Sequence, residues 1–237
     1  MKLIIIVSSL FFFSFSALAG QFLETFENTN LEEWQELIWL NLDIGAVSWE
    51  IINGELQGIA PMAITRLLII GNEIWQDYDI EIDVKPLKKH GPGNIAIAAR
   101  VKGTSAIWCF VGDTPTIVEE DGVPPPEPES LVSCWGGNFH EGKKSRIFKS
   151  KVHPLLKLNK WSTLKLGIHT NNLSFWINGK PVLESMVDLP GLLIGKGGLG
   201  IAGYTARFDN ITITHKNGLF VQPQAKLTTT WGRLKRF

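Results

Sequence analysis

The sequence predicts an all-β fold, an antiparallel sandwich or barrel, and three observations support this prediction. Apolar and polar residues alternate with a period of two along most of the chain. Turn residues separate about a dozen short runs of this kind. Hardly any window has the apolar spacing of a helix, so we expect strands with one face packed inward and the other facing solvent.

Length and composition indicate one globular domain. The chain has 237 residues, of which 44% are hydrophobic and 19% are charged, and its formal net charge is zero. A disordered chain would have fewer apolar residues and more net charge, and a nucleic-acid-binding protein would carry a basic excess. These two classes are therefore excluded, and we expect no nucleic-acid partner.

The first residues predict a signal peptide. A short positive start at Lys2 is followed by a nearly uninterrupted apolar run over residues 3–15, and Ala17-Leu18-Ala19 fits a cleavage site. Residues 1–19 are therefore expected to be removed, which places the protein outside the cell, in a periplasm or at a cell surface. An uncleaved anchor is the alternative, although the run is short for a bilayer of about 30 Å. No later segment of the sequence has the length and apolarity of a transmembrane span.

The clearest strand covers residues 78–85, where Ile80, Ile82 and Val84 alternate with polar residues and form the predicted core face. A separate strand, 94–101, turns at Lys102-Gly103 into the next one. The remaining strands are expected at 106–112, 164–168, 173–177, 181–183, 197–202 and 206–214. The turns between 168 and 181 are Asn171-Asn172 and Asn178-Gly179, of which the second is the stronger hairpin signal.

The two cysteines lie in apolar runs that are predicted as strands. If Cys109 lies opposite Cys134 in an antiparallel pair, Trp108 lies opposite Trp135, because both pairs have the same sum of residue numbers. Cross-strand cysteines can reach bonding distance, and an oxidising compartment preserves the bond. We therefore predict a disulfide, with two buried free thiols as the alternative.

Two charged segments interrupt the strand pattern. Residues 113–130 contain six acidic residues, no basic residue and several prolines, so we expect an exposed loop; it either stays solvated or folds back on the basic hairpin that follows. Residues 215–237 contain five Lys or Arg residues and no acidic one. This basic C-terminal tail is expected either to be an untethered terminus or to dock on an anionic surface or a protein partner.

Three segments together resemble the concanavalin A-like lectin/glucanase superfamily, especially its laminin-G-like and 3-keto-disaccharide-hydrolase-type branches. They are Trp49 to Leu56, Trp161 to Lys180, and Gly197 to Ile201 followed by Phe208 to Ile211. The likeness covers roughly residues 22–214. It implies that residues 20–214 form a jelly-roll β-sandwich of two curved antiparallel sheets, with a concave face that in many relatives meets carbohydrate.

Glu81 and Asp83 are the best candidates for catalysis. In the retaining glucanases of this fold, a Glu-x-Asp strand ends in a second Glu at the fifth or sixth position, and alternation projects all the acids into one cleft. Here those later positions hold Lys85 and Pro86, neither of which readily donates a proton at neutral pH. The glucanase site is therefore incomplete, and an ordinary solvent-facing strand surface is the alternative interpretation.

Asn94 and Arg100 carry the resemblance to the 3-keto-disaccharide-hydrolase branch. If their strand is regular, both lie on one face with small residues between them, and the guanidinium suits a sugar hydroxyl or carboxylate. Alternatively Arg100 pairs with Asp79, Glu81 or Asp83 on a neighbouring strand.

Trp176 is the main candidate for sugar binding. A turn at Asn171-Asn172 places it opposite Gly167, with Lys165 and His169 nearby. An exposed indole can stack on the C–H face of a pyranose while polar neighbours bind its hydroxyl groups. Alternatively, another loop or the tail covers this indole.

The resemblance also implies a structural calcium ion near the joined terminal strands. Asp209 lies in the segment that resembles this region, and Glu24 or Glu27 could supply a second oxygen ligand. The alternative is that Asp209 caps a turn. No organic cofactor is expected, because the five His residues lack ligand spacing and the chain has no Gly-rich phosphate loop.

We therefore expect a secreted, lectin-like module that binds a glycan or oligosaccharide and lacks a complete catalytic site. The expected binding residues are Trp176, His169, Lys165, Arg100 and Asn94. The alternatives are a hydrolase that acts on a glycan or keto-disaccharide through the concave face, and a structural or adhesion module that binds protein.

Overall fold

The structure, a computed structural model, describes residues 21–27, 30–42, 45, 47–113 and 130–215. The predicted signal peptide, nearly all of the predicted acidic loop and residues 216–237 of the predicted tail lie outside the described residues. In the described part, no helix has the length and apolarity needed to span a membrane.

Thirteen strands and two short 3-10 helices make up the described chain. In order they are β1 (Gln21–Glu24), β2 (Gln35–Ile38), η1 (Trp39–Asn41), β3 (Ser48–Ile52), β4 (Glu55–Ala60), β5 (Arg66–Ile70), β6 (Tyr78–Lys102), β7 (Ser105–Gly112), β8 (Leu131–Asn138), η2 (Gly142–Lys144), β9 (Ser145–Val152), β10 (Ser162–His169), β11 (Asn172–Ile177), β12 (Lys180–Met186) and β13 (Lys196–His215).

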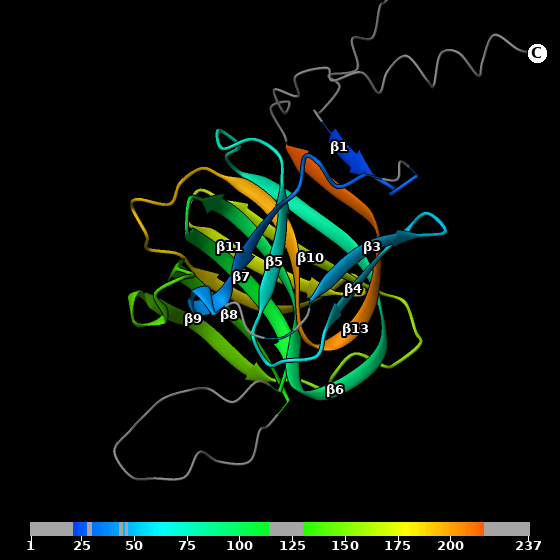
Figure 1. The fold of residues 1–237 in the computed structure, drawn as a ribbon. Coiled ribbons are helices and arrows are strands. Elements are labelled where there is room, and N and C mark those ends of the chain that lie inside the picture. The colour runs from blue at the N-terminus through cyan, green and yellow to red at the C-terminus, as the bar shows by residue number, and fades with distance from the viewer. Residues whose placement is uncertain (1–20, 28–29, 43–44, 46, 114–129, 216–237) are drawn as a thin grey trace, which may run out of the picture.

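Two long strands, β6 and β13, run through both layers of an antiparallel sandwich (Figure 1). Residues 78–89 of β6 pair with residues 204–215 of β13, and residues 94–101 pair with residues 196–202. The first layer has the order β12-β11-β10-β6-β13-β4-β3, and β1 also pairs with β13. The second has β9-β8-β7-β6-β13-β5-β2. The predicted antiparallel all-β class is confirmed.

The prediction of separate strands at 78–85 and 94–101 is wrong, because these segments are the two halves of β6. The chain does not turn back between them: residues 90–93 carry it from one layer to the other, and β13 is its partner on both sides of this crossing. β13 bends at Gly203, where φ is +66° and an added Cβ would lie 2.4 Å from the carbonyl oxygen of Pro92. Residues 79–83 and Arg100 therefore belong to different layers, and the ion-pair partner of Arg100 is Asp77.

The Asn178-Gly179 turn forms as predicted and joins β11 to β12. Both residues have positive φ, 52° and 73°, which this Asn-Gly pair adopts readily. Asn178 also fixes the turn to β10, because its side-chain oxygen accepts a hydrogen bond from the Thr163 N–H at 2.9 Å.

The turn between β10 and β11 lies one residue earlier than predicted, at residues 170–171. As a result Lys165, and not Gly167, is the ladder partner of Trp176. The Asp77 carboxylate fixes this position by accepting a hydrogen bond of 2.6 Å from the N–H of the first turn residue. Moving the turn by one residue moves each ladder partner by two residues. Because side chains alternate with a period of two, every side chain keeps its predicted face.

The main core lies between the two layers. Ile80, Ile82 and Val84 are fully buried there, as their alternation predicts, and they pack with Leu166 of β10 and Leu199 of β13. A core of this kind, built from the inward residues of both layers, is what an antiparallel sandwich requires.

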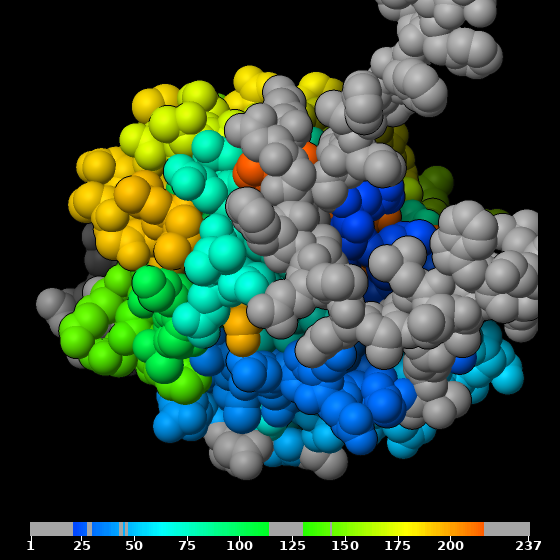
Figure 2. Space-filling view, turned by 90° about the horizontal axis from the view of Figure 1, so that it is seen from above, coloured from blue at the N-terminus to red at the C-terminus, as the bar shows by residue number. Residues whose placement is uncertain are grey.

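A second apolar cluster covers the outer side of the second layer. Trp108 is buried in it, and the rings of Trp39, Trp135 and Phe139 surround it at centroid distances of 5.4, 6.1 and 5.0 Å. The η1 segment is held over the cluster by a hydrogen bond of 3.0 Å from the Leu40 N–H to the Phe139 carbonyl. Figure 2 shows the blue N-terminal residues packed beside the green residues of this layer. These indoles therefore serve mainly as packing.

The predicted disulfide between Cys109 and Cys134 is present. The two residues lie opposite each other in the β7–β8 ladder, and Trp108 lies opposite Trp135, so the single predicted register accounts for both pairs. The bond joins neighbouring strands across a loop of 25 residues.

Replacing both cysteines by alanine is expected to lower the free energy of unfolding by about 3 kcal/mol, because the loop is then no longer closed in the unfolded chain. Urea unfolding with and without a reducing agent measures the effect. Reduction should destabilise the natural protein but not the double variant; equal stability of both proteins under oxidising conditions would contradict the expectation.

Candidate functional site

Most of the site residues predicted from the sequence lie on the outward side of the first layer. We call it the charged face and define it by outward residues from five strands and the residue before β10. They are Asp79, Glu81, Asp83 and Lys85 of β6, Trp161 before β10, Thr163, Lys165, Gly167 and His169 of β10, Ser174 and Trp176 of β11, Arg207, Asp209 and Asn210 of β13, and Glu55 of β4. Inward packing of the alternate residues on β6 and β10 fixes their direction.

One end of the charged face is built around Trp176. Its half-buried indole lies over Gly167, where an added Cβ would be 3.0 Å from the ring. The Lys165 ammonium lies 5.5 Å from the ring centroid. A glycine at this position therefore makes room for the indole on the sheet surface.

Asp79 connects the polar groups at this end. One carboxylate oxygen lies 2.8 Å from His169 Nε2, and the other lies 3.0 Å from Lys165 Nζ. All three side chains are partly exposed. The arrangement supplies donors and acceptors next to an aromatic ring, which are the two kinds of contact that a sugar requires.

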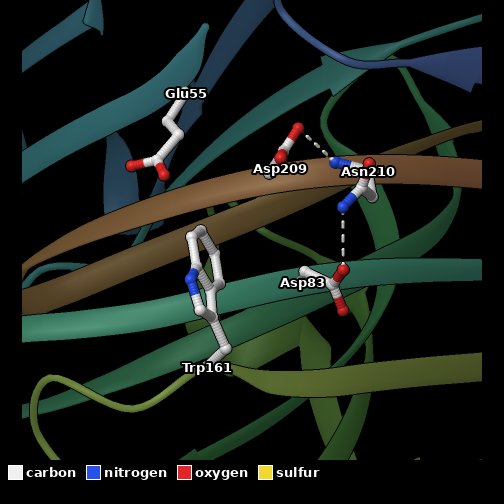
Figure 3. A pocket seen from close by; sticks show the side chains of 5 residues that line it. All are labelled: Glu55, Asp83, Trp161, Asp209 and Asn210. Carbon is white, nitrogen blue, oxygen red and sulfur yellow. Dashed lines mark hydrogen bonds between the residues drawn. The ribbon is translucent and has the colours of Figure 1, made fainter. Parts of the chain in front are cut away.

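The other end is a pocket of about 200 Å³ lined by Glu55, Asp83, Trp161, Asp209 and Asn210. Figure 3 shows that these side chains come from several separate segments, with the Trp161 indole rising toward Glu55. The Trp161 side chain is 41% exposed. The pocket thus combines an accessible aromatic ring with four polar side chains.

Hydrogen bonds hold Asp83 in place within the pocket. The Thr163 hydroxyl donates to one of its oxygens at 2.6 Å, and the Asn210 amide donates to the other at 3.0 Å. Asn210 has a φ of +51° at a register shift of β13, and the local irregularity turns this residue toward β6. Asp209 precedes it and is the ladder partner of Asp83.

Cations neutralise Glu55 on the other side of the pocket. Arg207 Nη1 lies 2.8 Å from one oxygen, and Lys85 Nζ lies 3.8 Å from the other. The same ammonium lies 4.5 Å from the centroid of the Trp161 ring. The indole and the carboxylate are therefore held close together by one shared cation.

Partial burial raises the pKa of Asp209 above its usual value. The backbone N–H of Asn210 opposes the shift by donating a hydrogen bond, and the charges of Glu55 and Asp83 add to it. Asp209 is thus the carboxyl group of the pocket that holds a proton more readily than an exposed aspartate.

Six of the predicted candidates share the charged face: Glu81, Asp83, Lys165, His169, Trp176 and Asp209. Glu81 is exposed between the two ends, and it makes no hydrogen bond or ion pair with the described part of the chain.

Arg100 is placed differently from the prediction. Its side chain is 1% exposed, and its φ of +49° breaks the regular alternation that would have put it on the same face as Asn94. Nη2 donates to the Thr170 carbonyl at 2.7 Å and to Asp77 at 3.1 Å. Burial lowers the pKa of this guanidinium, and the charge of Asp77 opposes the shift. Arg100 therefore fixes the turn at 170–171 from inside the fold.

Asn94 is 2% exposed and lies in the second layer, away from the charged face. Its amide donates to the Thr65 hydroxyl at 2.9 Å. The structure therefore separates Asn94 and Arg100 from the other candidates, although the sequence placed them together.

The expected calcium ligands do not come together. Asp209 shares its pocket with Glu55 and Asp83, and Glu27 does not line it. Both oxygens of Asp83 already accept hydrogen bonds, and both oxygens of Glu55 face cations. In the part of the chain that the structure describes, no three His, Cys, Asp or Glu side chains are arranged to hold a metal ion, so these residues do not fit a calcium ion.

Sequence reasoning missed three residues as site residues: Trp161, Glu55 and Asn210. Trp161 could have been found, because it continues the period-two pattern of Thr163 and Lys165 by one more step. Glu55 and Asn210 reach the pocket through the pairing of β4 and β6 with β13, which the sequence does not reveal.

Comparisons with known proteins agree with this architecture. The model of the family of 3-keto-alpha-glucoside-1,2-lyase-like domains matches residues 21–214. A search of curated proteins found no match.

Several solved structures share the fold. A carbohydrate-binding module, CBM66, from Bacillus subtilis is 16% identical, with a TM-score of 0.57 over 77% of this chain and 96% of that one. A Bacillus subtilis protein with a galectin-like fold is 13% identical, with a TM-score of 0.59 over 81% and 94%. The β-glucanase of Bacillus licheniformis is 14% identical, with a TM-score of 0.52 over 84% and 99%. These likenesses confirm the predicted jelly-roll sandwich.

Replacing Asp209 by Asn is expected to stabilise the protein at pH 7, because it removes a carboxylate whose ionised form is disfavoured by burial and by two nearby charges. As the pH falls through the raised pKa, Asp209 in the natural protein takes up a proton, so the advantage of the variant should shrink. It should vanish below the usual value of 3.8. Denaturant unfolding across this pH range measures the difference, and a variant less stable than the natural protein at pH 7 would contradict the argument.

Proposed function

Because the chain belongs to the family of 3-keto-alpha-glucoside-1,2-lyase-like domains, we propose that it is an exported protein whose charged face binds carbohydrate. The disulfide supports export, because such bonds persist in oxidising compartments. The fold shared with a carbohydrate-binding module and a β-glucanase is consistent with a sugar ligand but does not identify the site.

The observation that carries the proposal is the arrangement around Trp176. A half-buried indole is supported by a glycine and bordered by Asp79, Lys165 and His169. The ring offers an apolar surface to a pyranose, and the three polar side chains offer hydrogen bonds to its hydroxyl groups. The outer side of the second layer is less suitable, because its indoles pack mainly on one another.

Replacing Trp176 by Ala is expected to weaken binding of the glycans selected on a glycan array by about tenfold or more, which corresponds to roughly 1.4 kcal/mol. The lost contact is the stacking of the sugar on the indole. Circular dichroism of the variant should remain that of a folded β-protein, because the side chain lies outside the core.

Trp135→Ala is the matched control, since Trp135 is also a half-buried indole on an outer surface but belongs to the second layer. It should keep glycan binding under conditions where both variants are folded. If the Trp135 variant loses binding and the Trp176 variant does not, the site lies on the other layer.

A second candidate function, cleavage of a glycosidic bond, is favoured by one observation: Asp83 and Asp209 are directly opposite each other in the ladder and share the pocket. Directly opposite residues have Cβ atoms about 4.5–5.5 Å apart, a spacing compatible with the carboxyl pair of a retaining glycosidase. The glucanase strand pattern lacks its last acidic residue in this chain. We infer that Asp209 of the neighbouring strand β13 takes the place of that residue.

In this scheme Asp209 protonates the leaving glycosidic oxygen, since its pKa is raised, and Asp83 attacks the anomeric carbon. Asp83 is held for this role by the hydrogen bonds from Thr163 and Asn210. Water then releases the sugar from Asp83, and Asp209 accepts the proton of that water.

Asp83→Asn and Asp209→Asn should each lower the release of reducing sugar from a bound oligosaccharide at least a hundredfold, because each removes one half of the pair. Activity of the natural protein should fall as the pH rises through the raised pKa of Asp209. If Asp209→Asn stays folded and binds sugar but releases it at the natural rate, the face binds carbohydrate without this chemistry.

A further inference from the structure

The charged face has two separate aromatic contacts, Trp161 just before β10 and Trp176 beside the middle of β10. Trp176 is the ladder partner of Lys165, and Trp161 lies four residues before Lys165 along the chain. At roughly 3.3 Å per residue, the backbone positions of the two tryptophans are about 13 Å apart along the strand direction, and the Trp176 ring lies over Gly167, further still from Trp161. This distance exceeds a single sugar ring, so one monosaccharide cannot contact both.

The pocket at the Trp161 end is small. Its volume of about 200 Å³ lies below the roughly 300–1,000 Å³ of sites that enclose drug-sized ligands. It has room for one terminal sugar unit but not for an oligosaccharide. Any longer ligand that enters the pocket must therefore continue across the open surface of the sheet.

The surface between the two indoles is polar and accessible. Glu81 of β6 lies at the edge of this surface, level with Trp176 because both residues pair with Lys165, and it is exposed and without a hydrogen-bond or ion-pair partner among the described residues. Lys165 lies directly beside it as its ladder partner on β10, and Thr212 lies beside it on β13. Such side chains can bind the hydroxyl groups of sugar units that lie between the two aromatic contacts.

The charges of the face select against anionic sugars. Leaving His169 aside, its carboxylates outnumber its cations by two, and three of those carboxylates line the pocket. The carboxylates are Glu55, Asp79, Glu81, Asp83 and Asp209, and the cations are Lys85, Lys165 and Arg207. A uronate or a sulfate in the pocket would face like charges, which disfavours its binding.

We propose that the charged face binds a neutral oligosaccharide, with its terminal unit in the pocket beside Trp161 and a more distant unit stacked on Trp176. This proposal rests on the proposed function, because it assigns a length, a direction and a charge class to the same carbohydrate ligand. Trp161 and Glu81 become binding residues in addition to the group around Trp176.

Calorimetric titration with gluco-oligosaccharides of one to six units, from the maltose, cellulose and laminarin series, tests the proposal. Affinity for the natural protein should rise with length and then level off once both indoles are in contact. Trp161→Ala should weaken binding of the longest oligosaccharides by about tenfold and abolish the dependence on length. Oligogalacturonates of the same lengths should bind at least tenfold more weakly.

Ile147→Ala is the control, because Ile147 is 43% exposed, close to the 41% of Trp161, but lies on β9 in the other layer. This variant should bind as the natural protein does. If Trp161→Ala retains the full length dependence while Trp176→Ala loses binding, the inference of a two-ended site is overturned and the proposed function stands. If the natural protein binds none of these sugars, the inference is overturned, and the proposed function is overturned as well if no glycan on the array binds.

Discussion

The pairing of β6 with β13 is the constraint on which the rest of the structure depends. The two strands are partners in both layers, and they carry β10 and β4 in one layer and β7 and β5 in the other. Because each backbone group in the ladder needs its partner, the two strands must bend together where they pass between layers. The bend at Gly203 therefore fixes how the layers face each other, and alternation sets the direction of most side chains on either side of it.

This shared pair explains why the charged face can be so polar without loss of the core. In the first half of β6, the inward residues Ile80, Ile82 and Val84 are fully buried, and the residues that alternate with them are partly or fully exposed. Hydroxyl, amide and cationic groups surround Asp83 and Glu55 near the surface. Asp209 lies between them, and its pKa is raised by burial and by the charges of Glu55 and Asp83.

Much of the fold could be predicted from the sequence, because alternation and turn chemistry are local properties. The faces of Ile80, Lys165 and Trp176 and the register of the two cysteines follow from them. The pairing of distant strands could not be predicted, and this is why Arg100 was expected on an open surface. Its guanidinium is buried against the turn at 170–171, which lies 70 residues away in the chain. The pocket was missed for the same reason, since four segments have to meet before it exists.

The disulfide has a consequence for the integrity of the chain. Cys109 and Cys134 flank the predicted acidic segment on its two sides, and they lie within strands that also pair through their backbones. A protease that cuts once between residues 113 and 130 would leave two fragments still joined covalently through sulfur. The protein would then migrate as one species on a gel until a thiol is added, and the nicked form would keep both β6 and β13 in place.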